Sequence, residues 1–170
     1  EPTFAEPTIG AYAIDDPVPA AGRLDETGPV AHADAGGPDT APGRNALLEL
    51  TCTWAEESNG HRSAVGVRGD AAQAIAALIG TTGRRRSLPT SEALTMLAWA
   101  GASGGAHGRR RGAARGRFEA WWCAAALVGL DGPGDDWPPD PDALGDALTD
   151  LRWWRWDSAL RPAGWFLGIA

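Results

Sequence analysis

Lysine is absent from the sequence, so all 15 basic residues are arginine. The phosphate-binding P-loop needs a lysine after its glycines, and the lack of lysine excludes that class of nucleotide site. Cysteine is scarce as well: Cys52 and Cys123 lie 71 positions apart, with no CxxC pair and no histidine at a metal-ligand spacing. We therefore expect no metal and no other cofactor. We also expect two buried free thiols, with a disulfide as the alternative.

Long apolar segments are also missing. No window approaches the roughly 18 uncharged apolar residues that a membrane-spanning helix requires. The first 30 residues are acidic and rich in proline, whereas a secretion signal starts with basic residues and continues with an apolar run. We therefore expect a soluble, cytoplasmic protein with no membrane partner. A chain of 170 residues is long enough for one domain with a hydrophobic core.

Charge is distributed unevenly along the chain. The formal net charge is −7, yet residues 84–117 hold eight arginines and a single acid, Glu92, so this block carries +7 and the rest carries −14. Overall acidity argues against non-specific binding to nucleic acid. A block of one sign predicts instead a local site for an anion.

Residues 1–43 differ in composition from the rest of the chain. They hold seven of the 13 prolines and eight acids against one arginine. This composition predicts an acidic, proline-rich arm that is partly ordered, followed by a single domain over 44–170.

Two β-hairpins are predicted from alternating patterns. Apolar and polar residues alternate over 47–56, Asn59 and Gly60 suit a tight turn, and residues 61–68 return. A helix over 45–55 is the alternative, because Leu47, Leu50 and Trp54 also fit a spacing of three and four. The second hairpin joins 151–157 to 164–169.

Four helices are predicted, over 70–79, 91–100, 109–130 and 142–150. Asp70 suits the start of the first helix, and Asp140 or Asp142 suits the start of the last. The third helix has the most regular pattern, with an apolar face made of Phe118, Trp121, Trp122 and Ala125. These elements predict an α+β domain in which three to four helices pack on a small antiparallel sheet of two hairpins.

The candidate site lies between the second and third predicted helices. A helix that begins at Arg109 would place three arginines where unpaired N–H groups and the helix dipole already favour negative charge. An anion bound there would remove the conflict, and nearby glycines would let the backbone approach it. The predicted anion-binding residues are Gly104, Gly105, His107, Gly108, Arg109, Arg110 and Arg111.

Several partners would satisfy this site. The first candidate partner is an acidic segment, either the stretch 131–150 or the acidic arm, from the same chain or from a partner chain. If a second copy of this chain supplies the segment, the protein is a homo-oligomer. A small anion such as phosphate is the second. Nucleic acid is the third and is disfavoured, although Gly105–Gly108 is similar to the GxxG loop of KH-type RNA binders.

Catalytic residues are not defined by the sequence. His107 is a candidate general base with Ser103 as a nucleophile, but no spacing indicates a catalytic triad. We favour a non-enzymatic binding or assembly module whose arginine-rich helix start receives an acidic segment or a small anion. The alternative is an enzyme or binding protein for a phosphorylated or nucleotide-like ligand that uses His107 and Arg109–Arg111.

Four segments carry a resemblance to a known group of proteins. They are Leu47–Trp54 (LLELTCTW), Glu57–Gly60 (ESNG), Ala98–Gly112 (AWAGASGGAHGRRRG) and Gly116–Trp122 (GRFEAWW). Together they resemble an uncharacterised actinobacterial family, a domain of unknown function, over residues 45–157. The resemblance implies a bacterial, cytoplasmic source and brings no activity with it.

Overall fold

The computed structural model describes residues 25–26, 41–80, 83–105, 107–132, 137–158 and 168–170. Its helices are α1 (Ala41–Leu50), α2 (Cys52–Glu56), α3 (Ala71–Ile79), α4 (Thr90–Ser103), α5 (Ala113–Leu127) and α6 (Pro141–Thr149). Its strands are β1 (Asp25–Glu26), β2 (Gly83–Leu88), β3 (Trp153–Ser158) and β4 (Gly168–Ile169). The α+β class predicted from the sequence is confirmed.

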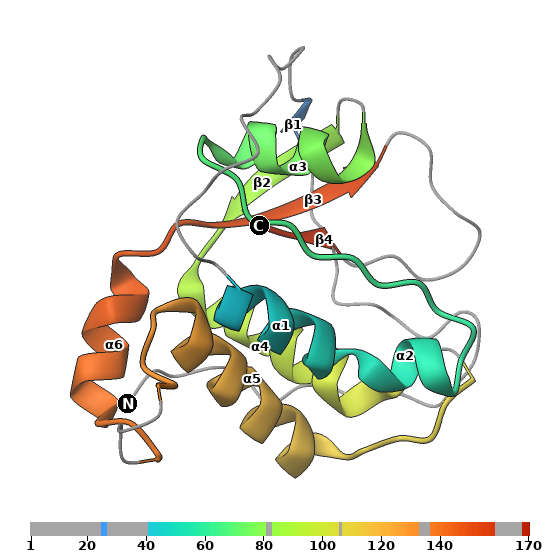
Figure 1. Cartoon of the computed structure of the whole chain (residues 1–170), viewed down its shortest axis with the longest axis vertical. Coiled ribbons are helices and arrows are strands. Elements are labelled where there is room, and N and C mark those ends of the chain that lie inside the picture. The colour runs from blue at the N-terminus through green and yellow to red at the C-terminus, as the bar shows by residue number, and fades with distance from the viewer. Residues whose placement is uncertain (1–24, 27–40, 81–82, 106, 133–136, 159–167) are drawn as a thin grey trace.

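The strands form one antiparallel sheet in the order β1-β2-β3-β4 (Figure 1). β2 and β3 pair along their whole length, from Gly83 opposite Ser158 to Leu88 opposite Trp153. Their connection is long, since α4, α5 and α6 lie between them in the chain. The sheet therefore depends on contacts between residues that are far apart in sequence.

The predicted hairpin over 47–56 and 61–68 is wrong. The first of these segments forms α1 and α2, as the helical alternative held, and residues 57–70 contain no strand. The helical spacing is the one that the fold uses: Leu50 is buried, and the Trp54 indole N–H donates to the Ala100 carbonyl oxygen at 3.1 Å. Asn59 does have a positive φ of 52°. However, the Gly60 N–H donates to the Trp54 carbonyl oxygen, so Gly60 lies in a turn that follows α2 and not in a hairpin.

The C-terminal part of the sheet agrees better with the sequence. β3 lies within one or two residues of the predicted strand over 151–157, and β4 pairs with it antiparallel. Residues 159–167, which include most of the second predicted strand, lie outside the described residues. β2 was not predicted, because three consecutive arginines are unusual in a strand.

Helix ends were predicted well wherever a side chain caps them. The Asp70 carboxylate accepts the Gln73 N–H in a capping box at α3, and Gly80 ends that helix in the left-handed conformation. At α6, Asp140 accepts N–H groups from Asp142 and Ala143. α5 has no side-chain cap, and it begins at Ala113 and not at the predicted Arg109.

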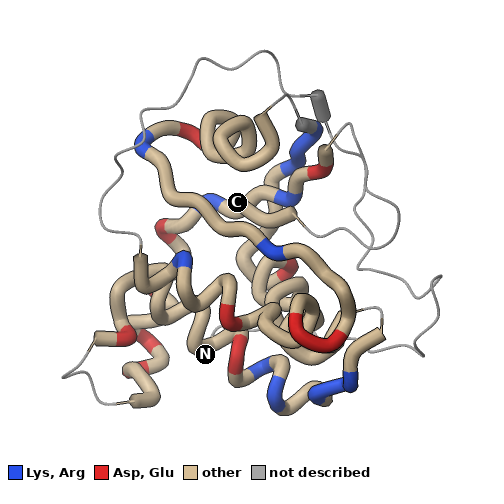
Figure 2. Tube along the Cα trace, turned by 45° about the vertical axis from the view of Figure 1, so that its right-hand side comes forward, with Lys and Arg blue, Asp and Glu red and all other residues tan. Residues whose placement is uncertain are grey.

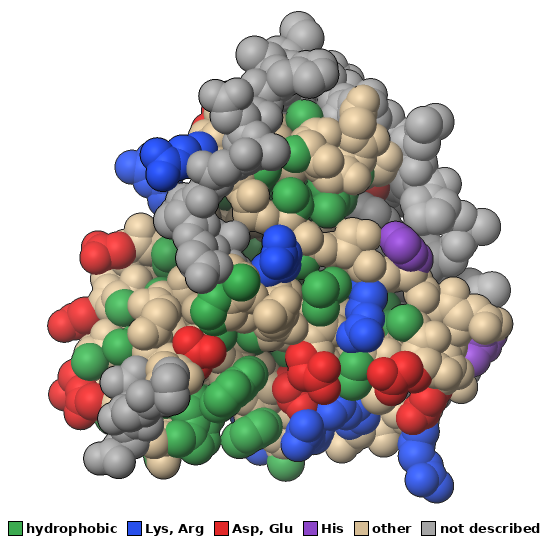
Figure 3. Space-filling view, in the orientation of Figure 1, with side chains coloured by type: hydrophobic (Ala, Val, Ile, Leu, Met, Phe, Trp, Pro, Cys, Tyr) green, Lys and Arg blue, Asp and Glu red, His purple; other side chains and the backbone are tan. Residues whose placement is uncertain are grey.

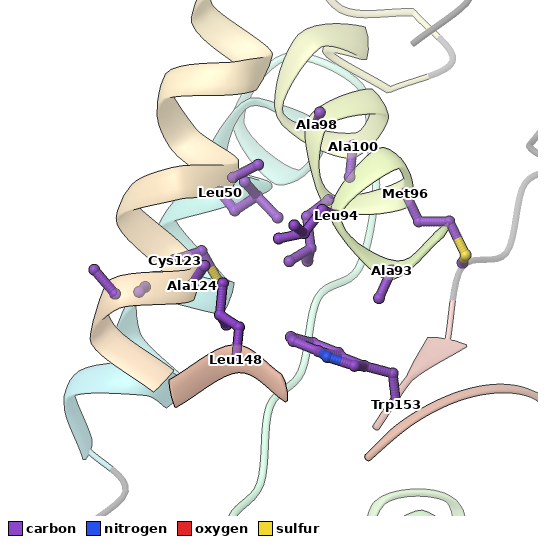
Figure 4. Packing of buried hydrophobic residues seen from close by; sticks show 14 of the residues in the cluster. Leu50, Ala93, Leu94, Met96, Ala98, Ala100, Cys123, Ala124, Leu148 and Trp153 are labelled. Atoms are coloured by element: carbon purple, nitrogen blue, oxygen red, sulfur yellow. The ribbon is translucent and has the colours of Figure 1, made fainter. Parts of the chain in front are cut away.

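The core lies where α4 meets its neighbours. α1, α4 and α5 pack against one another, α4 also contacts β3, and α3 lies on β2 and β3 (Figure 1). Every residue from Met96 to Ser103 is buried. Around α4, Leu50 of α1, Cys123 of α5, Leu148 of α6 and Trp153 of β3 converge (Figure 4).

The helices α4 and α5 approach each other very closely. A Cβ atom on Gly116 would lie under 3.0 Å from the Ala98 carbonyl oxygen and from the Ala102 side chain. No larger residue fits there without moving a helix. This contact fixes the two ends of the segment that joins α4 to α5.

The predicted arm contributes to the domain at two points. β1 adds a strand to the sheet, and α1 begins at Ala41, two residues before the expected boundary. The rest of residues 1–40 lies outside the described residues. Within the described ranges, no helix is long and apolar enough to cross a membrane.

Candidate functional site

The segment Gly104–Gly112, here called the basic loop, joins α4 to α5 and contains every predicted site residue. Arg109, Arg110 and Arg111 precede the first helical residue of α5, Ala113, so the helix does not start at the triplet. Gly112 occupies the N-cap position without a side-chain cap. The three arginines therefore lie before α5, and not in its first turn, where the sequence predicted a conflict with the helix dipole.

The backbone of the basic loop is fixed by hydrogen bonds within the protein. Four N–H groups donate to protein acceptors: Gly105 to Ser103 Oγ (3.2 Å), His107 to Ser58 Oγ (2.7 Å), Arg109 to Glu57 Oε2 (3.0 Å) and Arg111 to the Ala102 carbonyl (2.9 Å). The segment after α2 thus supplies two acceptors that hold the loop. These four N–H groups are already used and do not face an external anion.

The loop glycines are explained by close packing. Gly104 and Gly105 have φ values of 71° and 79°, which favour glycine. A Cβ on Gly104 would clash with the Arg109 carbonyl, one on Gly108 with the Gly104 carbonyl, and one on Gly105 with Ser58. Glycine at these positions lets the loop fold back on itself and on the segment after α2.

Arg111 is neutralised inside the molecule. Its Nη2 atom lies 3.0 Å from Glu119 Oε1, and Arg115 pairs with the same oxygen, as the i,i+4 spacing in α5 predicts. The Glu119 side chain is 4% exposed and that of Arg111 is 17% exposed. The counter-charge for one of the three loop arginines is thus an acid of α5.

The other basic side chains of the loop lie at the surface. Arg109 and Arg110 are exposed, and so is His107. The His107 ring makes no hydrogen bond and no ion pair with any part of the chain that the structure describes, and Ser103 is 2% exposed. The loop therefore presents two arginines and a histidine to the solvent, whereas Ser103, the candidate nucleophile, is buried.

Arginines concentrate in two regions of the fold, the basic loop with the start of α5 and strand β2 (Figure 2). On β2, Arg84 pairs with Asp157 at 3.2 Å, Arg86 pairs with Glu92 at 2.7 Å, and the Arg85 guanidinium lies 4.6 Å from the centre of the Trp154 ring. Each of the three has a partner from β3 or α4. The sequence analysis left this triplet outside the predicted helices and strands and assigned it no role beyond its share in the basic block 84–117.

An exposed aromatic cluster was also missed. Phe118 of α5 is 45% exposed and Trp137 is 40% exposed, although Phe118 belongs to the apolar face predicted for this helix. Trp137 packs edge-on against Phe118 (6.0 Å between ring centres) and against Trp122 (4.9 Å), and the Arg115 guanidinium lies 5.3 Å from the Phe118 ring. We call Phe118, Trp122 and Trp137 the aromatic cluster. Hydrophobic side chains gather over α5 on the face seen in Figure 3.

Both cysteines are free thiols, as the sequence predicts, but only Cys123 is fully buried. Burial, with a smaller contribution from Glu119, raises the pKa of the Cys123 thiol to about 12. Burial and the nearby Glu49 also raise the pKa of Cys52. In the described ranges, no group of three or more His, Cys, Asp or Glu residues is arranged to hold a metal ion.

Comparison with known proteins identifies the family of the chain. Neither a curated protein nor a solved structure matches the chain. The model of a family of unknown function, DUF6183, matches residues 12–170, which include both arginine-rich regions and the aromatic cluster. The chain therefore belongs to the DUF6183 family.

Proposed function

We propose that the protein is a non-enzymatic binding or assembly module whose docking surface consists of the basic loop and the aromatic cluster. The occupant is an acidic protein segment that also carries apolar side chains. The observation that carries this proposal is the joint exposure of Phe118 and Trp137 beside Arg115. Exposed aromatic side chains and arginines are typical of the energetically important centre of protein interfaces.

An acidic peptide suits this surface better than a small anion does. Four N–H groups of the basic loop are already bonded to protein acceptors, so they do not contribute to binding a small anion. A peptide with carboxylates and apolar side chains would pair with Arg109 and Arg110 and cover the aromatic rings as well. A reducing, cytoplasmic setting in a bacterium belongs to the same proposal, because two free thiols suit such a compartment.

The test is a titration of the full chain with a synthetic peptide of repeating Glu-Asp-Leu, compared with repeating Gln-Asn-Leu. Neither peptide contains tryptophan, so the tryptophan fluorescence of the chain, to which Trp122 and Trp137 contribute, reports binding. At 100 times its dissociation constant, the acidic peptide stabilises the fold by about 2.7 kcal/mol. For a chain of this length, that raises the melting temperature by roughly 5–10 °C.

Variants separate the two halves of the surface. Arg109→Ala with Arg110→Ala, and Phe118→Ser with Trp137→Ser, each weaken peptide binding at least tenfold. Arg152→Ala is the matched control, because Arg152 is exposed and lies outside this surface. Equal stabilisation by both peptides, or by neither, overturns the proposal.

Titration with inorganic phosphate and ADP tests the alternative function. A melting shift that depends on His107 and Arg109–Arg111 would favour a phosphorylated ligand and displace the peptide proposal.

A further inference from the structure

α6 carries three aspartates that have no cationic partner within the described part of the chain. Asp142, Asp146 and Asp150, here called the acidic stripe, follow one another at i,i+4 spacing, and all three are exposed. None of them forms an ion pair with a described residue. Like charges at this spacing repel one another, and the C-terminal end of a helix disfavours the negative charge of Asp150. Cations that bind the acidic stripe would remove both costs.

The unlike charge lies at the other end of α5. The basic loop precedes the N-terminal end of α5, and the guanidinium group of Arg109 has no ion-pair partner among the described residues. α6 lies beside the C-terminal half of α5, where Leu148 lies next to Cys123 and Ala124 (Figure 4). A helix of 15 residues is about 22 Å long. The acidic stripe of one chain is therefore too far from the basic loop of the same chain to neutralise it (Figure 1).

The aromatic cluster lies between these two charged surfaces. Phe118 and Trp122 belong to the middle of α5, and Trp137 packs against both, three residues before the N-cap of α6. Figure 3 shows hydrophobic side chains over α5 and acidic side chains over α6 on one face of the molecule. The order along α5 is thus basic loop, aromatic cluster, acidic stripe. Such a surface is self-complementary, because a two-fold rotation about its centre brings each charged end to the unlike end of a second copy.

We propose that the occupant of the docking surface is a second copy of the same chain, bound in a two-fold symmetric dimer. The acidic stripe of each copy contacts Arg109 and Arg110 of the other, and the two aromatic clusters pack together at the centre of the interface. This inference rests on the proposed function, because it names the partner of the same surface. α6 has the chemistry required of that partner, since its aspartates follow the exposed ring of Trp137.

The test reverses the charges of each half of the interface and measures the mass of the full chain by sedimentation equilibrium. The acid-reversed variant carries Asp146→Arg with Asp150→Arg, and the base-reversed variant carries Arg109→Glu with Arg110→Glu. Both keep the fold, because arginine suits the C-terminal end of α6 and glutamate suits the segment before α5. We expect the unaltered chain to be a dimer at micromolar concentration. In each variant like charges meet at both ends of the interface, so the dissociation constant should rise at least about a hundredfold.

A mixture of the two variants provides the decisive measurement. In a mixed dimer, the arginines on α6 of one copy face the glutamates of the other, and the unaltered aspartates face unaltered arginines. An equimolar mixture should therefore dimerise as tightly as the unaltered chain. Arg68→Glu is the control, because Arg68 is exposed and precedes α3, outside the interface, and its reversal should leave the dissociation constant unchanged.

Failure of this inference is distinguishable from failure of the proposed function. A monomeric unaltered chain, unchanged association of either variant, absence of dimers in the mixture, or growth beyond the dimer overturns the inference. The acid-reversed variant keeps the basic loop and the aromatic cluster, so it should still bind the repeating Glu-Asp-Leu peptide. If it does not bind that peptide, the proposed function is wrong, whatever the oligomeric state of the unaltered chain.

Discussion

At the scale of single residues, the Glu119 carboxylate is the charge around which the start of α5 is organised. It lies on the buried side of the helix and accepts from Arg111 in the basic loop and from Arg115 one turn earlier. A buried carboxylate is costly unless it is paired, and a buried pair is costly to break. The orientation of the basic loop thus depends on one acid in the neighbouring helix.

Glu119→Gln should lower the free energy of unfolding by about 3 kcal/mol, because it leaves the mostly buried Arg111 guanidinium without its counter-charge. The matched control is Glu92→Gln, which removes the acid of an ion pair whose carboxylate is 50% exposed and should cost less than about 1 kcal/mol. Urea unfolding at neutral pH measures both. Equal losses for the two variants would contradict the role assigned to Glu119.

At the scale of elements, the basic loop is a rigid connection between two closely packed helices. Its shape follows from glycines at positive φ, from backbone donors bonded to the segment after α2, and from the close approach of α4 and α5. None of these contacts involves a ligand. The loop therefore keeps its shape without an occupant.

Gly104→Ala and Gly80→Ala form a matched pair that tests this packing. Both glycines end a helix in the left-handed conformation, with φ values of 71° and 67°. A Cβ on Gly80 meets no atom within 4 Å. The Gly80→Ala variant should therefore lose only the free energy of holding a non-glycine residue in the left-handed conformation, about 1 kcal/mol. A Cβ on Gly104 clashes with the Arg109 carbonyl, and we expect a total loss of about 3 kcal/mol in urea unfolding. Similar losses for the two variants would show that the loop yields easily.

Elements with local signals were predictable from the sequence, and elements made by distant contacts were not. The starts of α3 and α6 follow from Asp70 and Asp140, whose carboxylates bond to N–H groups two or three residues away. The helical pair of Arg115 with Glu119 is local in the same way. β2, by contrast, becomes a strand through its pairing with β3, whose Asp157 is 73 positions from Arg84.

Ambiguous patterns were decided by burial. Residues 47–54 fit both an alternating and a helical spacing, and the contact of Trp54 with Ala100 and Trp99 favours the helix. In α5, Phe118 and Ala125 belong to one apolar stripe, yet only Ala125 is buried. The sequence locates the stripe but not which part of it the core covers, so the aromatic cluster could not be predicted.

At the scale of the whole molecule, one buried thiol makes the free energy of unfolding depend on pH. Cys123 lies at 0% exposure between α5 and its neighbours, and its pKa of about 12 exceeds the ordinary value of 9.0. Between these two values, the unfolded chain loses this proton while the folded chain retains it. The stabilisation is complete below pH 9 and is lost as the pH rises towards 12.

Cys123→Ala should make the alkaline decline in stability shallower by up to about 1.4 kcal/mol per pH unit above pH 9. Urea unfolding at pH 8, 9, 10 and 11 measures the slope. Cys52→Ala is the control, because Cys52 is only partly buried and should change the slope less. An unchanged slope for Cys123→Ala would contradict the assignment.

The glycine contact between α4 and α5 has a kinetic consequence for any docking partner. Since the two helices leave no room for a side chain at Gly116, the basic loop between them starts from a fixed geometry. A partner that fits this geometry binds a preorganised surface, so the basic loop loses little conformational entropy on binding. Association should then be a single-step, diffusion-controlled encounter whose rate rises linearly with partner concentration, without the plateau that a slow rearrangement imposes.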